Sequence, residues 1–269
     1  MLSHVSPQEV PATVIRVENL WCGYAEGPVI KGISFRIKRG EFIGILGPNG
    51  SGKTTLLLAL SGVAAVQDGR IEVLDSPIER LKPKERACRM AMVTQDGDMR
   101  FPFSCEEVVR MGRYPHQSRW RVDASGDERA VRTALRITDT QSLADRLVTA
   151  ISGGEKQRVA MARVLAQETP ILLLDEATSA MDIHRKLQIF RVLERLNRDE
   201  GLTVVAVLHD INLAALFCRR MLFLKEGEMV ADGPTDSVLT SDVLRTVYRT
   251  EVLVQEIPNT GKRQVVFLP

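Results

Sequence analysis

The sequence has 269 residues, of which 44% are hydrophobic and 26% are charged, a composition that is typical of globular proteins and excludes collagen-like and disordered chains. The 36 basic and 34 acidic residues leave a net charge of +2, whereas a dedicated nucleic-acid-binding protein carries a large basic excess. The longest nearly unbroken apolar stretch, residues 56–66, is shorter than the roughly 18–20 residues of a membrane span. We therefore expect no membrane-spanning segment and no nucleic-acid partner.

The length permits one α/β domain with a minor subdomain, so we expect a single domain over residues 1–269. The N-terminus has neither the basic patch nor the apolar core of a secretory signal, which predicts that the chain stays in the cytosol. The four cysteines are scattered and form no C-x-x-C pair, which argues against a zinc site and a disulfide framework.

The first forty residues alternate between apolar and polar side chains, as antiparallel strands do. Ile15 and Val17 follow this pattern, and Ile33, Phe35 and Ile37 repeat it after a glycine-containing turn. The pattern then changes to short apolar runs, which are typical of parallel strands buried on both faces. The runs are residues 42–46, 171–174 and 204–208, and helical stretches lie between them at 53–60, 155–167 and 185–198. This order predicts a P-loop-type α/β core, a mostly parallel sheet with helices on both faces, preceded by an antiparallel β subdomain.

The middle of the chain has a different character. Residues 95–141 combine prolines and glycines with helical patches at 105–111 and 127–136, so we expect an α-helical subdomain, inserted into the core over about residues 96–160. A strand pair at 221–224 and 229–231 follows, and one short helix is predicted from Thr235 through about residue 247, at the start of a C-terminal extension over about residues 235–269.

A phosphate-binding loop is the strongest motif of the chain. The sequence matches G-x-x-x-x-G-K-[ST] in full, after an apolar strand and at the start of a helix. The matched residues are Gly47, Pro48, Asn49, Gly50, Ser51, Gly52, Lys53 and Thr54. Thr55 follows in the same helix, and we expect it to bind the nucleotide with them. Glycines let backbone N–H groups turn toward phosphate oxygens, and the N-terminus of a helix favours an anion. We expect Lys53 to bridge the β- and γ-phosphates and the Thr54 hydroxyl to ligate Mg²⁺, although kinases, GTPases, helicases and transporters all use such a loop.

Polar residues also follow two other buried strands. Asp175 and Glu176 come at the end of the run 171–174, at the sheet edge where open parallel sheets bind their ligands. We expect Asp175 to hold Mg²⁺ and Glu176 to act as the general base that orients the attacking water, although such a pair can also cap a helix. His209 ends the third strand and is either a γ-phosphate contact or a structural residue.

The stretch I-S-G-G-E-K-Q-R at residues 151–158 resembles the signature motif of ATP-binding cassette (ABC) ATPases. The other motifs of that family follow in its order, with residues 179–182 similar to the D-loop. The resemblance implies that Tyr24 stacks on adenine, that Gln95 senses Mg²⁺ and the γ-phosphate, and that His209 is the switch histidine. It also implies a head-to-tail homodimer with ATP at its interface. The residues that the resemblance adds to the nucleotide site are Ser152, Gly153, Gly154 and Asp182.

The resemblance implies a separate ATPase subunit of an importer, bound at the cytoplasmic face of the inner membrane to permease subunits and, through them, to a substrate-binding protein. The E-V-V-x-x-G-R-x-P pattern at residues 107–115 is similar to importers of iron–siderophores, haem and cobalamin. The alternatives are a zinc or manganese importer, a non-transport ABC ATPase and a P-loop kinase. We expect Phe101, Phe103 and Tyr114 to be exposed and to dock on the permease, unless they are buried within the subdomain.

Overall fold

The computed structural model describes residues 12–94, 101–117 and 124–268. Its centre is a six-stranded sheet with the strand order β10-β9-β3-β8-β7-β6, in which only β10 is antiparallel to its neighbour. Its strands are β3 (Phe42–Leu46), β6 (Met90–Val93), β7 (Ile171–Asp175), β8 (Thr203–Val207), β9 (Arg220–Lys225) and β10 (Glu228–Pro234). Every residue of β3, β7 and β8 is buried, as the apolar runs in the sequence predict.

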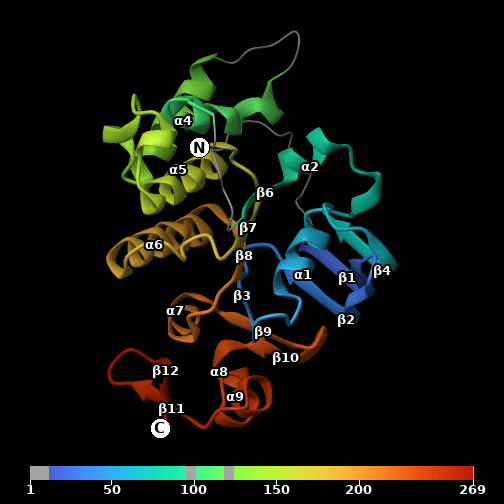
Figure 1. Cartoon of the computed structure of the whole chain (residues 1–269). Helices are drawn as coiled ribbons and strands as arrows, with labels where there is room; N and C mark the ends of the chain where they lie inside the picture. The colour runs from blue at the N-terminus through green and yellow to red at the C-terminus, as the bar shows by residue number, and fades with distance from the viewer. Residues whose placement is uncertain (1–11, 95–100, 118–123, 269) are drawn as a thin grey trace.

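The two faces of this sheet are covered by different elements (Figure 1). One face packs against α5 (Gly153–Ala166), α6 (Ile183–Glu200) and α7 (Ile211–Phe217), where Phe190 stacks on Phe42. The other face packs against α1 (Lys53–Leu60) and an antiparallel sheet. The consecutive residues Phe42 and Ile43 of β3 point to opposite faces and therefore enter separate hydrophobic clusters. The predicted α/β core with helices on both faces is confirmed.

The antiparallel sheet has the order β2-β1-β4-β5. The strands are β1 (Thr13–Tyr24), β2 (Gly27–Lys38), β4 (Val66–Val73) and β5 (Ser76–Pro77), and α2 (Pro83–Arg89) follows them. The predicted N-terminal antiparallel subdomain is thus present, and β4 extends it. The sequence did not predict β4 because its first half is mostly exposed and lacks an apolar alternation.

A separate group of helices, which we call the helical subdomain, packs beside this core at the top of Figure 1. Its elements are α3 (Cys105–Arg110), the 3₁₀ segment Met111–His116, α4 (Ala124–Ile137) and the two 3₁₀ turns Gln141–Leu143 and Val148–Ala150. Val109, Val131, Leu135 and Val159 form part of its own hydrophobic cluster, so α5 contributes to both this cluster and the central core. No helix in the described part of the chain is long and apolar enough to span a membrane.

The C-terminal part differs from the prediction. Instead of one helix from Thr235 to residue 247, the structure has α8 (Thr235–Val238) and α9 (Ser241–Tyr248). The break occurs at Thr240, whose extended backbone and side-chain acceptor cap the second helix at the Val243 N–H. The chain then ends in an unpredicted hairpin of β11 (Val252–Ile257) and β12 (Lys262–Phe267), which packs on α7.

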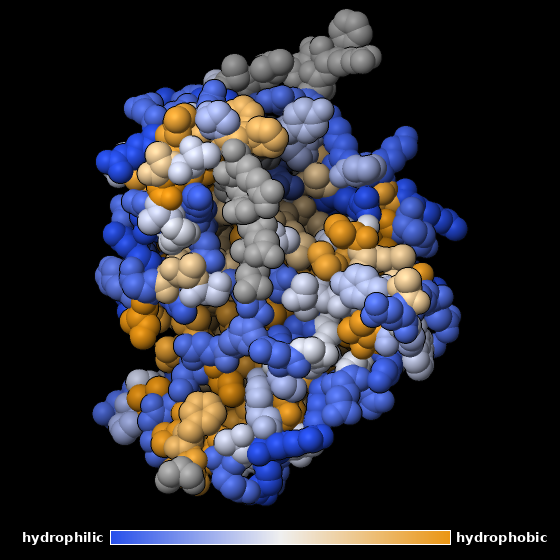
Figure 2. Space-filling model, in the orientation of Figure 1, coloured by the Kyte–Doolittle hydropathy of each residue, from blue (hydrophilic) through white to orange (hydrophobic). Residues whose placement is uncertain are grey.

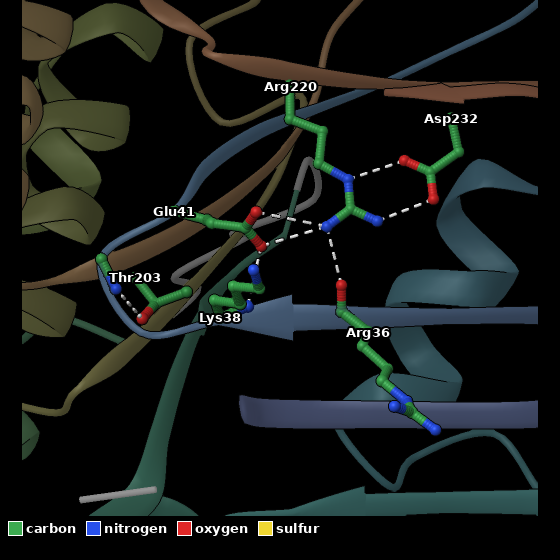
Figure 3. A network of polar contacts seen from close by, with 7 residues as sticks. Arg36, Lys38, Glu41, Thr203, Arg220 and Asp232 are labelled. Carbon is green, nitrogen blue, oxygen red and sulfur yellow. Dashed lines mark hydrogen bonds and ion pairs between the residues drawn. The ribbon is translucent and has the colours of Figure 1, made fainter. Parts of the chain in front are cut away.

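Arg220, the first residue of β9, lies in a polar network that joins the two sheets (Figure 3). Its guanidinium donates to both carboxylate oxygens of Asp232, at 2.6 and 2.7 Å, and to Glu41 at 3.1 Å. It also donates to the backbone carbonyl of Arg36 in β2, at 2.7 Å. Because Asp232 belongs to β10 and Arg36 to β2, this one side chain ties the antiparallel subdomain to the edge of the central sheet.

Replacement of Arg220 by Met should lower the free energy of unfolding by about 2–3 kcal/mol, because two partly buried carboxylates lose their cation while the aliphatic length is kept. Urea denaturation measures the change. Arg198→Met is the matched control, since the Arg198–Asp199 pair is mostly exposed and its loss should leave the midpoint of urea denaturation nearly unchanged. Equal losses in the two variants would contradict this role of the network.

Candidate functional site

The sequence-predicted site residues meet at one edge of the central sheet. The strands β6, β7, β8 and β3 are parallel neighbours, so their carboxyl ends lie side by side. The phosphate loop follows β3, Asp175 ends β7, Glu176 comes next, and His209 follows β8 after one further residue. Gln95, which follows β6 in the sequence, lies outside the described residues.

The phosphate loop has a backbone that requires glycine. Gly47 and Gly52 have φ values of +152° and +97°. A Cβ atom at Gly47 would lie 2.1 Å from the carbonyl oxygen of Leu224, and one at Gly52 would lie 2.7 Å from Ile30. Gly52 also begins α1 without a side-chain cap, so the first N–H groups of that helix stay available for an anion.

Two polar groups of the phosphate loop, the Lys53 ammonium and the Ser51 hydroxyl, are buried. Lys53 is only 5% exposed, and its Nζ donates to the carbonyl oxygens of Gly47 and Pro48, each at 2.9 Å. Burial lowers the pKa of Lys53, and the charges of Glu176 and Asp175 oppose this shift. The Ser51 Oγ is buried with no hydrogen-bond partner within the described structure. A buried cation and an unpaired hydroxyl in one loop match the needs of an anionic ligand.

The predicted Mg²⁺ ligands Thr54 and Asp175 are in contact. The Thr54 hydroxyl donates to Asp175 Oδ1 at 3.1 Å, and Asp175 is buried. Burial raises the pKa of Asp175, while the Thr54 hydrogen bond and the Lys53 charge lower it. Because burial disfavours the ionised carboxylate, a cation beside it restores a favourable environment, and carboxylate and hydroxyl oxygens are the ligands that Mg²⁺ prefers. The side chain of Thr55, in contrast, is buried within the fold.

Glu176 and His209 are also brought together. His209 Nε2 is hydrogen-bonded to Glu176 Oε1, although Glu176 follows β7 and His209 follows β8. The Glu176 side chain is 14% exposed and that of His209 is 47% exposed, so the pair lies at the surface edge of the site. Glu176 has a φ of +50°, an uncommon backbone conformation for a residue with a side chain.

The alternative role of the Asp175–Glu176 pair, as a cap of the next helix, does not hold. Helix α6 is capped by Asp182, whose Oδ1 accepts from the Arg185 N–H at 2.9 Å. This bond lowers the pKa of Asp182. Asp182, predicted as a nucleotide contact, thus has a structural role in the single chain.

The signature motif leads into α5, and we call its first residues, 151–154, the signature loop. Ser152 caps this helix in a reciprocal arrangement, accepting from the Glu155 N–H at 3.3 Å while its own N–H and hydroxyl donate to the Glu155 carboxylate, each at 2.8 Å. These bonds lower the pKa of Glu155. Ser152 and Gly153 are exposed, and no described atom lies within 4 Å of a Cβ position at Gly153. The helix N-terminus is therefore open to a ligand from outside.

Tyr24 ends β1 and is 55% exposed. The next strand of its hairpin carries Val29 and Ile30, which lie against Gly52 of the phosphate loop. The aromatic ring is thus on a hairpin that borders the phosphate loop, as a base-stacking residue requires.

Two contacts of the site were not predicted from the sequence. Gly227, in the turn between β9 and β10, donates its N–H to the Ser51 carbonyl at 3.3 Å. Burial raises the pKa of Tyr248 in α9 to about 12, and a hydrogen bond with the Gly47 backbone opposes the shift. Residues from the C-terminal part of the chain therefore support the phosphate loop, and no local sequence signal marks them.

Comparison with known proteins gives the family. A family model described as ABC transporter matches residues 30–179, which is more than half of the chain. The hemin import ATP-binding protein HmuV of Pseudomonas fluorescens is 41% identical over 259 residues, covering 94% of this chain and 99% of that protein. The ferric enterobactin transport ATP-binding protein FepC of Escherichia coli is 37% identical over 255 residues, covering 94% and 93%.

A solved structure, described as a metal-chelate type ABC transporter in an inward-facing conformation, superimposes with a TM-score of 0.82 at 28% identity. The match covers 96% of this chain and 98% of that chain. These matches confirm the resemblance that the signature motif indicates. The chain therefore belongs to the ABC transporter family, as one of its ATP-binding subunits.

Proposed function

We propose that this chain hydrolyses ATP to power the import of a metal chelate, an iron–siderophore, haem or cobalamin, through a separate permease. The observation that carries the proposal is the convergence of Lys53, the Thr54–Asp175 pair and the Glu176–His209 pair at one sheet edge. The names of HmuV, FepC and the metal-chelate transporter support the substrate class. A zinc or manganese importer is the alternative substrate class.

The residues divide the chemistry between them. The phosphate loop and Lys53 bind the phosphates, and Tyr24 stacks on the base. Thr54, Asp175 and Gln95 would hold Mg²⁺, which would supply positive charge beside the phosphates. Glu176 orients the attacking water and accepts its proton, while His209 fixes the Glu176 carboxylate by their hydrogen bond.

A head-to-tail homodimer completes the site in this proposal. The N-terminus of α5 is exposed at Ser152 and Gly153, and no described atom lies within 4 Å of a Cβ position at Gly153, so a phosphate held by another chain could approach it. In a two-fold dimer, each signature loop covers the ATP bound by the partner, so two ATP molecules lie at one isologous interface. Asp182 at the end of the D-loop would reach this interface.

The permease is proposed to dock on the helical subdomain. Phe101, Phe103 and Tyr114 are 71%, 42% and 75% exposed, so they are not buried within the subdomain. The exposed Tyr114 borders a cleft of about 280 Å³ between this subdomain and the core. In Figure 2, apolar side chains gather among polar ones on the upper part of the molecule, over the helical subdomain. Exposed aromatic anchors in a polar surrounding are typical of interfaces.

Gly112 and Arg113, from the E-V-V-x-x-G-R-x-P pattern, fix the backbone of this proposed docking surface. A Cβ atom at Gly112 would lie 2.1 Å from the Arg163 carbonyl oxygen, so the segment packs directly on α5. The buried Arg113 donates to Asp127 at 2.8 Å and to the Ala166 carbonyl at 2.7 Å, which links the 3₁₀ segment to α4 and α5. These two residues fix the backbone from which Tyr114 projects.

Docking on a membrane permease would make this chain a peripheral protein at the cytoplasmic face of the inner membrane.

Replacement of Tyr114 by Asp tests this function. We expect chelate uptake by the assembled transporter and binding to the permease to fall at least about tenfold, because a desolvated charge would lie at the centre of the interface. ATP hydrolysis by the isolated subunit should stay within about twofold of wild type, because Tyr114 is exposed on the helical subdomain, whereas Lys53, Asp175 and Glu176 lie at the edge of the central sheet. Uptake of labelled haem, ferric siderophore and cobalamin is compared in reconstituted vesicles, which also identifies the chelate.

Leu253→Asp is the matched control, since Leu253 is 48% exposed on the C-terminal hairpin, and it should leave uptake unchanged. Unchanged uptake in Tyr114→Asp would move the docking surface elsewhere. Uptake of Zn²⁺ or Mn²⁺, with none of the three chelates transported, would favour the alternative substrate class.

A further inference from the structure

The side chain of Gln157 connects the signature helix to the loop that follows Glu176. Gln157 is half-buried in the second turn of α5. Its Nε2 donates to Ser179 Oγ at 3.3 Å, and its Oε1 accepts from the Ala180 N–H at 3.1 Å. A single amide therefore uses both its donor and its acceptor on consecutive residues of the D-loop.

A second contact holds the same two segments together. A Cβ atom at Gly154 would lie 3.3 Å from the carbonyl oxygen of Ala180, so the start of α5 packs closely on the D-loop backbone. Ala180 is thus contacted by Gln157 through its N–H and approached by Gly154 at its carbonyl. A shift of the signature helix cannot leave the D-loop in place without breaking these contacts.

The D-loop is in turn bonded to the proposed general base. The Ser179 N–H donates to the Glu176 carbonyl oxygen at 3.0 Å, and the Glu176 side chain is hydrogen-bonded to His209. Glu176 holds its positive φ of +50° within this turn. A displacement of Ser179 therefore acts on the backbone that orients the Glu176 carboxylate.

We infer that Gln157 is a positioning residue that couples the signature loop to Glu176 of the same chain. The inference rests on the proposed dimer, in which the signature loop contacts the ATP of the partner subunit whereas Glu176 serves the ATP of its own. Occupancy of one ATP site would then set the position of the base in the other. Gln157 makes the two sites hydrolyse ATP cooperatively.

The variant Gln157→Met tests this role, because Met keeps the length of the side chain and removes both hydrogen bonds. We expect kcat to fall by about 10- to 100-fold, as misplacement of a base does, and the Hill coefficient for ATP to fall from above 1 toward 1. The ATP affinity of the isolated chain and its Tm should stay near wild type, since Gln157 lies outside the phosphate loop. Gln141→Met, at an exposed position of the helical subdomain, is the control for the same chemical change.

Gln157→Glu is the conservative variant. Its carboxylate can accept from the Ala180 N–H and from the Ser179 hydroxyl, so it should recover most of the turnover and the cooperativity. Wild-type turnover and Hill coefficient in Gln157→Met would overturn the inference. A variant that loses only Tm or ATP affinity would also overturn the inference, because that is the result expected if the hydrogen bonds of Gln157 only stabilise the fold. Failure of the dimer itself is detected separately, because Glu176→Gln would then sediment as a monomer with ATP and Mg²⁺.

Discussion

Replacement of Glu176 by Gln should reduce ATP turnover by about 100-fold or more, while ATP still binds. Gln has the shape of Glu but cannot accept the proton of the attacking water. The phosphate loop, Lys53 and the Thr54–Asp175 pair are untouched, so the ground-state contacts with the nucleotide remain. Steady-state hydrolysis and ATP binding by titration, measured on the same preparation, separate the two effects.

The exposed Glu200, the last residue of α6, provides the matched control, because β8 begins at Thr203 and the site lies at the other end of that strand. Glu200→Gln removes a carboxylate of the same type away from the site. This variant should hydrolyse ATP at the wild-type rate. Near wild-type turnover in Glu176→Gln would remove Glu176 from the role of base. A loss of ATP binding in that variant would instead mean that the carboxylate acts mainly in holding the site together.

Replacement of Lys53 by Ala should abolish nucleotide binding at millimolar concentrations, a loss of about 100-fold or more in affinity, because a buried cation that pairs with the phosphates is removed. Lys53 is 5% exposed and is held by the loop carbonyls at 2.9 Å, so its ammonium is already placed for an anion. Calorimetric titration with ATP and Mg²⁺ measures the change.

The exposed Lys82 should tolerate the same change with no effect on ATP affinity. If Lys53→Ala binds ATP as tightly as wild type but hydrolyses it slowly, Lys53 would act only in the transition state, and our assignment to ground-state binding would be wrong.

Much of the core could be predicted from the sequence because its signals are local. The strands β3, β7 and β8 are short apolar runs, and the phosphate loop has a strict residue pattern. The convergence of Asp175, Glu176 and His209 also followed, since the ends of parallel strands meet at one edge. The contact between His209 and Glu176 required only that β7 and β8 be neighbours, which the structure shows.

Other features depend on contacts between distant segments and left no local pattern. The strand β4 begins with exposed residues, so its pairing with β1 decides its conformation. The hairpin of β11 and β12 is held through Asn212 of α7, whose side chain bonds the Val265 N–H and carbonyl. The contact of Gln157 with Ala180 joins two motifs that the sequence shows separately, and only the fold reveals that one side chain spans them.

The central claim is that two chains share two ATP sites, and a mixing experiment tests it most directly. Lys53→Ala removes one half of each site, and Gly153→Asp places a carboxylate in the open signature loop, opposite the phosphate of the partner subunit. Each variant alone should be inactive. An equimolar mixture should regain turnover above that of both parents, to at most about a quarter of wild type, because half of the dimers are mixed and each holds one intact site of two. The coupling through Gln157 lowers the value below a quarter, since the second site of a mixed dimer is empty. A mixture as inactive as its two parents would contradict the shared sites.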